Sequence, residues 1–117
     1  MPKKIATDAG RAALAAVDAG SVSRADTGTA VRYLLQLLAE KAPGNAVEMR
    51  VPPFGAVQAV EGPRHTRGTP PNVVETDART WIAVATGVEG WSDAATAGRI
   101  VASGVRSDLS DLLPLRP

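Results

Sequence analysis

The stretch from Asn72 to Leu113 contains most of the predicted strands and helices of the chain. It reads NVVETDARTWIAVATGVEGWSDAATAGRIVASGVRSDLSDLL. Val73–Thr76 predicts a short strand, and Asp77 stands where the N-cap of a helix belongs. Apolar residues then recur at helical spacing up to Gly87, a residue type that commonly ends helices. The stretch therefore begins as a strand followed by a capped helix.

The remainder of this stretch predicts a helix, a strand and a second helix. Ser92 is expected to cap a short helix over residues 93–97. The β-branched run Arg99–Ser103 predicts a strand that Gly104 ends. The leucines of residues 109–113 predict a closing helix.

The clearest helix of the chain lies upstream. Asp26 or Thr27 is expected to cap it, and Pro43-Gly44 is expected to end it. One face carries apolar side chains at positions i, i+3, i+4 and i+7, which predicts packing against a sheet. These side chains are Val31, Leu34, Leu35 and Leu38.

Two strands are expected after this helix. Val47–Val51 alternates apolar and charged residues, which predicts a half-buried strand. Pro52-Pro53 ends it because proline cannot donate to a strand ladder. Ala56–Glu61 returns as a second strand of an antiparallel hairpin. Gly62–Asn72 then forms a long loop with three prolines, and a loop of this length in a small domain is often functional.

These elements predict an α+β domain with a mainly antiparallel sheet of four to five strands, covered by helices on one face. The alanine-rich segment Ile5–Ala19 predicts a helix with a thin apolar stripe. We therefore expect residues 1–24 to be an N-terminal helical arm and linker, and residues 25–117 to be the domain.

Composition excludes several classes of function. Thirteen basic and twelve acidic residues leave a formal charge of +1, so no nucleic-acid partner is expected. The chain has no cysteine and one histidine, so we expect no disulfide, no metal site and no cofactor. No apolar run approaches the roughly 20 residues that span a bilayer. A cytoplasmic protein without stable membrane insertion is expected, while its oligomeric state, including a homodimer, stays open.

The landmarks Asp77, Thr86-Gly87, Ala94–Gly98, Ile100–Gly104 and Leu109–Leu113 follow the order seen in one family. They resemble the C-terminal half of the sterol carrier protein-2 superfamily. The whole chain is similar to its small stand-alone bacterial members. The resemblance implies that fold and non-enzymatic binding or transfer of a lipid or other apolar small molecule, in a cavity between sheet and helices.

Two sets of residues are candidate ligand contacts. Arg64, His65 and Arg67 gather donors on the proline-rich loop and could hold an acidic head group. The favoured alternative is a solvated loop whose arginines pair with nearby acids such as Glu61 or Glu75. The resemblance implies a cavity lined by apolar side chains. The positions are Phe54, Trp81, Val84, Leu109, Leu112 and Leu113.

Catalysis is not expected, because His65 has no nucleophile motif, second histidine or phosphate-binding loop to accompany it. An alternative function also follows from resemblance. Similar domains form the C-terminal part of thiol-dependent maleylpyruvate isomerases, whose metal ligands belong to another domain. The chain would then be an accessory or protein-interaction domain that is inactive alone.

Overall fold

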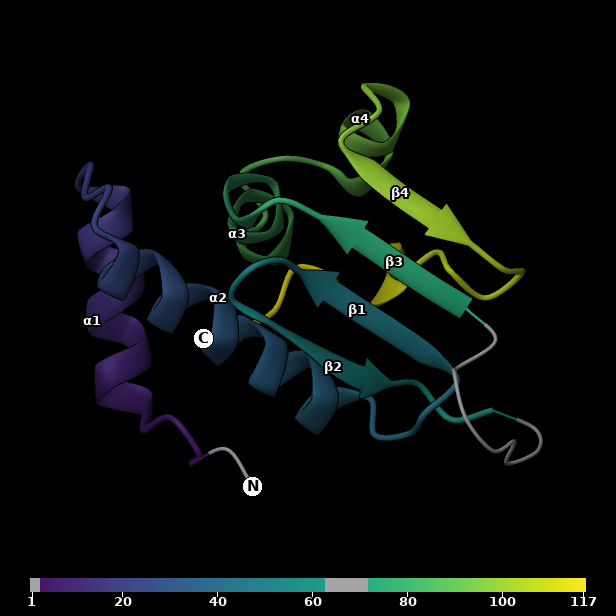
Figure 1. Cartoon of the computed structure of the whole chain (residues 1–117), viewed down its shortest axis with the longest axis horizontal. Helices are drawn as coiled ribbons and strands as arrows, with labels where there is room; N and C mark the ends of the chain where they lie inside the picture. The colour runs from purple at the N-terminus through teal and green to yellow at the C-terminus, as the bar shows by residue number, and fades with distance from the viewer. Residues whose placement is uncertain (1–2, 63–71) are drawn as a thin grey trace.

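The computed structural model describes residues 3–62 and 72–117 of the chain. Within these ranges the fold is α+β, as predicted, with one four-stranded sheet packed against helices (Figure 1). The helices are α1 (Thr7–Asp18), α2 (Arg24–Lys41), α3 (Ala78–Thr86) and α4 (Trp91–Thr96), with a 3₁₀ turn, η1, at Ser110–Leu112. The strands are β1 (Val47–Val51), β2 (Gly55–Ala59), β3 (Asn72–Thr76) and β4 (Ile100–Ser103).

The sheet is mixed and has the strand order β2-β1-β3-β4. β1 pairs antiparallel with β2, which confirms the predicted hairpin, and β3 pairs antiparallel with β4. The central pair, β1 with β3, is parallel. Val47 lies opposite both Ala59 of β2 and Asn72 of β3. β3 therefore starts where β1 starts, and the four-stranded sheet is mixed, with two antiparallel pairings and one parallel pairing.

One face of the sheet is buried against helices. Met49 and Val74, neighbours on β1 and β3, have no exposed surface, and neither has Trp81 of α3. The predicted apolar face of α2 belongs to the same core cluster. Burial of this helix face and this sheet face removes most of the large apolar side chains from water, which is the main stabilising contribution in a domain of this size. The α2 residues are Val31, Leu34, Leu35 and Leu38.

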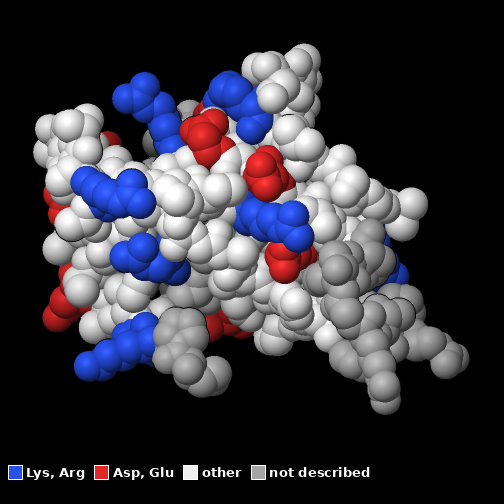
Figure 2. All heavy atoms as spheres, in the orientation of Figure 1, with Lys and Arg blue, Asp and Glu red and all other residues white. Residues whose placement is uncertain are grey.

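The opposite face of the sheet carries charged side chains. Glu48 and Arg50 alternate with the buried residues of β1 and form an ion pair. Glu75 is the cross-strand neighbour of Arg50. Figure 2 shows charged side chains of both signs near the middle of this face. The alternation predicted for Val47–Val51 is thus confirmed.

Asp77 caps α3 as predicted. Its Oδ1 accepts the Thr80 N–H at 2.8 Å, and its Oδ2 accepts the Thr80 hydroxyl at 2.8 Å. Gly87 ends the helix in the left-handed conformation, at φ 85°, which glycine adopts without a Cβ penalty.

Three helix ends differ from the expectations. Ser23 caps α2, with its Oγ accepting the Asp26 N–H at 3.0 Å, while the Asp26 carboxylate accepts the Ser21 hydroxyl at 2.6 Å. α4 follows Gly90 without a side-chain cap, so Ser92 lies inside the helix. The closing helix is only the turn η1. Leu113 precedes Pro114 and is extended, because proline disfavours the helical conformation in the residue before it.

The predicted N-terminal helix is present as α1, which packs on α2 at one side of the molecule (Figure 1). Gly10 lies against Tyr33, and a Cβ at Gly10 would stand 2.3 Å from the ring atom Cγ. Tyr33 is only 2% exposed. The division into an arm (1–24) and a domain (25–117) stays a prediction, although α2 already begins at Arg24.

Candidate functional site

A groove lies between α2 and the edge strand β2. Its volume is about 670 Å³, within the range of roughly 300–1,000 Å³ that is typical of small-molecule sites. We call it the α2–β2 groove. Its lining residues are Lys3, Lys4, Ile5, Arg32, Leu35, Gln36, Ala39, Glu40, Phe54, Gly55, Ala56 and Val57.

The floor of the α2–β2 groove is apolar. Leu35 and Ala39 come from the same face of α2, four residues apart. Val57 comes from β2, on the sheet face that the helices cover. Gly55 lies next to this helix face, and a Cβ there would stand 3.5 Å from Leu35 Cδ1, an ordinary van der Waals contact. Such a surface favours an apolar ligand.

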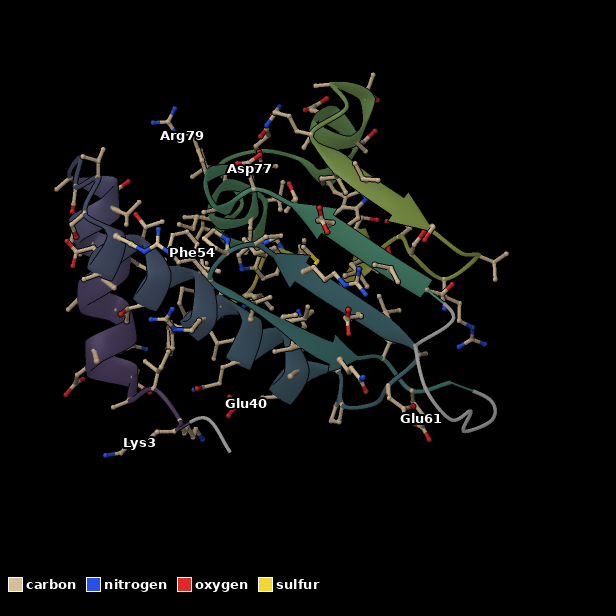
Figure 3. The ribbon with its side chains drawn as sticks, in the orientation of Figure 1. Lys3, Glu40, Phe54, Glu61, Asp77 and Arg79 are labelled. Atoms are coloured by element: carbon tan, nitrogen blue, oxygen red, sulfur yellow. The ribbon has the colours of Figure 1, made fainter. Side chains whose placement is uncertain are left out.

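One end of the groove combines an aromatic ring with two cations. Phe54 is half-buried beside the N-terminal half of α2 (Figure 3). The guanidinium carbon of Arg24 lies 5.4 Å from the ring centroid, a cation–π distance. Arg32 lines both the groove and an adjoining hollow that Arg24, Pro53 and Phe54 share. Among residues 3–62 and 72–117 neither arginine has a carboxylate partner, so this end can accept an anion.

Gly28 makes this end of the groove possible. Arg24, Gly28 and Arg32 recur every four residues, which places them on one face of α2. A Cβ at Gly28 would stand 3.0 Å from Phe54 Cδ1 and 3.0 Å from Arg32 Nη1. The missing side chain therefore provides the space in which the ring and the guanidinium lie together.

The N-terminal segment forms a wall of the groove. The Ile5 N–H donates to Gln36 Oε1 at 2.8 Å, and Gln36 Nε2 donates to the Ile5 carbonyl at 3.0 Å. Lys4 Nζ lies 3.1 Å from Glu40 Oε2. Gln36 and Glu40 are four residues apart on α2, so one helix face holds the segment in place. Figure 3 shows Lys3 and Glu40 on the same side of the molecule.

The six predicted cavity residues do not gather at one site. Phe54 lines the α2–β2 groove. Trp81, Val84 and Leu109 are at most 2% exposed and belong to the packed core, where Trp81 Nε1 donates to the Val31 carbonyl at 3.3 Å. Leu112 lines a shallow hollow beside Pro43 and Val60, and Leu113 is half-buried against the core.

The predicted head-group residues Arg64, His65 and Arg67 lie outside the described residues. The cations that lie at the α2–β2 groove beside Phe54 are instead Arg24 and Arg32, which are not among the predicted site residues. A sequence pattern does point to these two arginines, because Gly28 stands midway between them and all three residues share one face of α2. What the sequence does not reveal is that Phe54 lies against this face.

A charge network near α3 has a structural role. Arg99 forms a two-pronged ion pair with Glu89 and also donates to Thr80 Oγ1 at 3.4 Å. The hydrogen bonds that Arg99 donates to the Glu89 carboxylate lower the pKa of Glu89 and raise the pKa of Arg99. Burial tends to raise the pKa of Asp77, but hydrogen bonds from Thr80 and the charge of Arg99 lower it overall. These groups join the start of α3 to β4.

No group of three or more histidine, cysteine or acidic residues is arranged to hold a metal ion in residues 3–62 and 72–117. None of the helices seen in these ranges is both long enough and apolar enough to span a bilayer.

A protein-family model described as bacterial SCP ortholog matches residues 23–115. The chain belongs to this family. The match confirms the predicted relationship to the small bacterial sterol carrier-like proteins. No curated protein matches the chain.

The limits of the family match coincide with structural landmarks. It begins at Ser23, the cap of α2, and ends at Leu115, whose N–H donates to the Ala85 carbonyl at 2.7 Å. The matched part of this bacterial SCP ortholog therefore includes the floor and the basic end of the α2–β2 groove. α1 and the wall formed by residues 3–5 lie outside it.

Proposed function

We propose that the protein binds an apolar small molecule with an acidic head group in the α2–β2 groove, and that it acts as a carrier rather than an enzyme. The observation that supports this most is the apolar floor ending at Phe54, Arg24 and Arg32. Membership of the bacterial SCP ortholog family also favours a non-enzymatic, sterol carrier-like role.

The two parts of the groove contribute differently to affinity. Burial of the apolar tail contributes most, at roughly 25 cal/mol per Å² before the costs of association. Both arginines are exposed, and an exposed ion pair contributes up to about 1 kcal/mol. The arginines would therefore select among head groups, while the floor provides the binding.

Calorimetric titration with straight-chain carboxylates and the matching alcohols tests this function. Each added methylene that fits the groove should tighten binding by up to about fourfold. Arg24→Ala and Arg32→Ala should each weaken the acids by up to about fivefold and leave the alcohols unchanged. Arg116→Ala is a matched control, since this exposed arginine lines neither hollow.

Two results would contradict this function. Equal losses for acids and alcohols would remove the head-group role of Arg24 and Arg32. No heat from any long-chain ligand would contradict the carrier role and favour the alternative, an accessory or interaction domain. The head-group role of Arg64, His65 and Arg67 stays a prediction, which the double variant Arg64→Ala/Arg67→Ala tests in the same titration.

A further inference from the structure

A second groove lies on another side of α2, between α1 and α3. Its volume is about 690 Å³, and it shares no lining residue with the α2–β2 groove. We call it the α1–α3 groove. One wall includes Leu14 and Val17 of α1, and the other includes Ile82 and Ala83 of α3. Each wall thus carries an apolar patch.

The rim of the α1–α3 groove is unusually apolar. Val22, between α1 and α2, is 88% exposed, and Val88, between α3 and α4, is 81% exposed. Both residues line the groove. Two large apolar side chains that project from the rim of one apolar groove mark an interaction surface more than isolated exposed residues do.

The two walls carry opposite charges. Asp18 lines the groove from α1, and Arg79 lines it from α3. Within the part of the chain that the structure describes, neither side chain has a hydrogen-bond or ion-pair partner. Figure 3 shows Arg79 pointing away from the body of the molecule. An acidic wall facing a basic wall is complementary to itself.

We propose that a second copy of this chain docks in the α1–α3 groove, with a two-fold axis running along the groove. This symmetry places α1 of each copy over α3 of the other, so that each Asp18 meets the Arg79 of the partner copy. Val22 follows α1 and Val88 follows α3, so the same rotation brings Val22 of one copy against Val88 of the other. The proposal is independent of the ligand function, since the α2–β2 groove stays open in the dimer.

A second copy fits this surface better than other occupants do. A purely acidic partner would pair only with Arg79, and a purely basic one only with Asp18. The two-fold arrangement pairs both residues in each copy, which gives two Asp18–Arg79 contacts. Complementary charge of this kind fixes orientation as well as attraction. Contact between the exposed valines of the two copies would remove apolar surface from water, as the buried parts of stable interfaces do.

Charge reversal tests the proposal by sedimentation analysis of the full chain. The native protein should dimerise within the range up to about 1 mM, where even an interface with a millimolar Kd is partly occupied. Asp18→Arg and Arg79→Asp should each raise the dimer Kd by about tenfold or more, because each change creates two repulsive contacts. An equimolar mixture of the two variants should form a heterodimer. In that heterodimer one Asp18–Arg79 contact is native, and the other has its two charges exchanged, so both contacts are attractive. Asp111→Arg, an exposed charge outside the groove, should change nothing.

Circular dichroism of each variant checks the fold, which should stay intact because both substituted side chains are exposed. A native protein that stays monomeric throughout this range would overturn the proposal. A dimer that survives both single reversals, or a mixture that fails to restore association, would overturn it as well, because the interface would then lie elsewhere.

Discussion

Gly28 and Asp77 show two ways in which one position shapes this protein. Gly28 is buried under Phe54 and Arg32, and a Cβ there would press on both side chains at 3.0 Å. Asp77 satisfies two donors of Thr80 at the start of α3. The glycine acts by leaving space for the groove, while the aspartate acts by satisfying helix donors that would otherwise lack a protein partner.

Replacing the α3 cap should lower stability without affecting the ligand. Asp77→Ala should reduce the free energy of unfolding by about 1 kcal/mol. Ser92→Ala is the matched control, because Ser92 caps nothing in the structure, and it should change stability by less than about 0.5 kcal/mol. Urea unfolding measures both. A ligand affinity that falls in Asp77→Ala while stability holds would show a direct binding role for Asp77.

The same cap should make stability depend on pH. The folded-state pKa of Asp77 is lowered from its usual value of 3.8; burial opposes the shift, while Thr80 and Arg99 produce it. The ionised carboxylate therefore stabilises the fold above about pH 4, and this contribution is lost as the pH falls through the folded-state pKa. Asp77→Asn retains an acceptor without the charge. The stability advantage of the native protein over this variant should shrink between about pH 5 and pH 2; a constant difference would contradict it.

α1 differs from the other helices in how it is held. Its main contacts are with α2, and the closest approach places Gly10 on the ring of Tyr33. Further ties are the Ile5–Gln36 hydrogen bonds, the Lys4–Glu40 ion pair, and a hydrogen bond from Arg11 Nη2 to the Pro117 carbonyl at 3.2 Å. Leu14 also packs against the core. Removal of this helix therefore leaves the sheet uninterrupted and exposes only the part of the core that Leu14 covers.

Removal of residues 1–22 should leave a folded domain with a lower melting temperature, because Tyr33 loses its cover. The truncation keeps the α2 cap, Ser23. Gly10→Leu should reproduce the loss in the full-length chain by separating α1 from Tyr33. Calorimetry measures both melting temperatures. A chain that no longer unfolds cooperatively after truncation would show that α1 is part of the core.

Elements that depend on near neighbours in the chain are predictable from the sequence. The apolar face of α2, the alternation in Val47–Val51 and the Asp77 cap each follow from local spacing, and all three are confirmed. The caps of α2 and α4 are less predictable, because several suitable side chains compete within a few residues. Ser23 takes the position for which Asp26 and Thr27 are also suited.

The arrangement of the whole molecule depends on contacts that sequence spacing does not contain. β1 pairs in parallel with β3 because the chain returns after β2 to the end of the sheet where β1 starts, so that Asn72 lies beside Val47. The α2–β2 groove requires Phe54, at the tip of a hairpin, to lie on the Arg24–Arg32 face of α2. Phe54 is identifiable as a ligand candidate from the resemblance, whereas its two cationic neighbours become identifiable only in three dimensions.

The location of the ligand is therefore the decisive question, and amide chemical-shift mapping answers it. A medium-chain saturated carboxylate is titrated into ¹⁵N-labelled protein below its micelle concentration. We predict that the largest shifts occur at Arg32, Leu35, Gly55 and Val57 in the α2–β2 groove, with little change at Ile82 and Ala83. Shifts concentrated instead at Trp81, Val84 and Leu109 would contradict this location and favour a cavity that opens within the core.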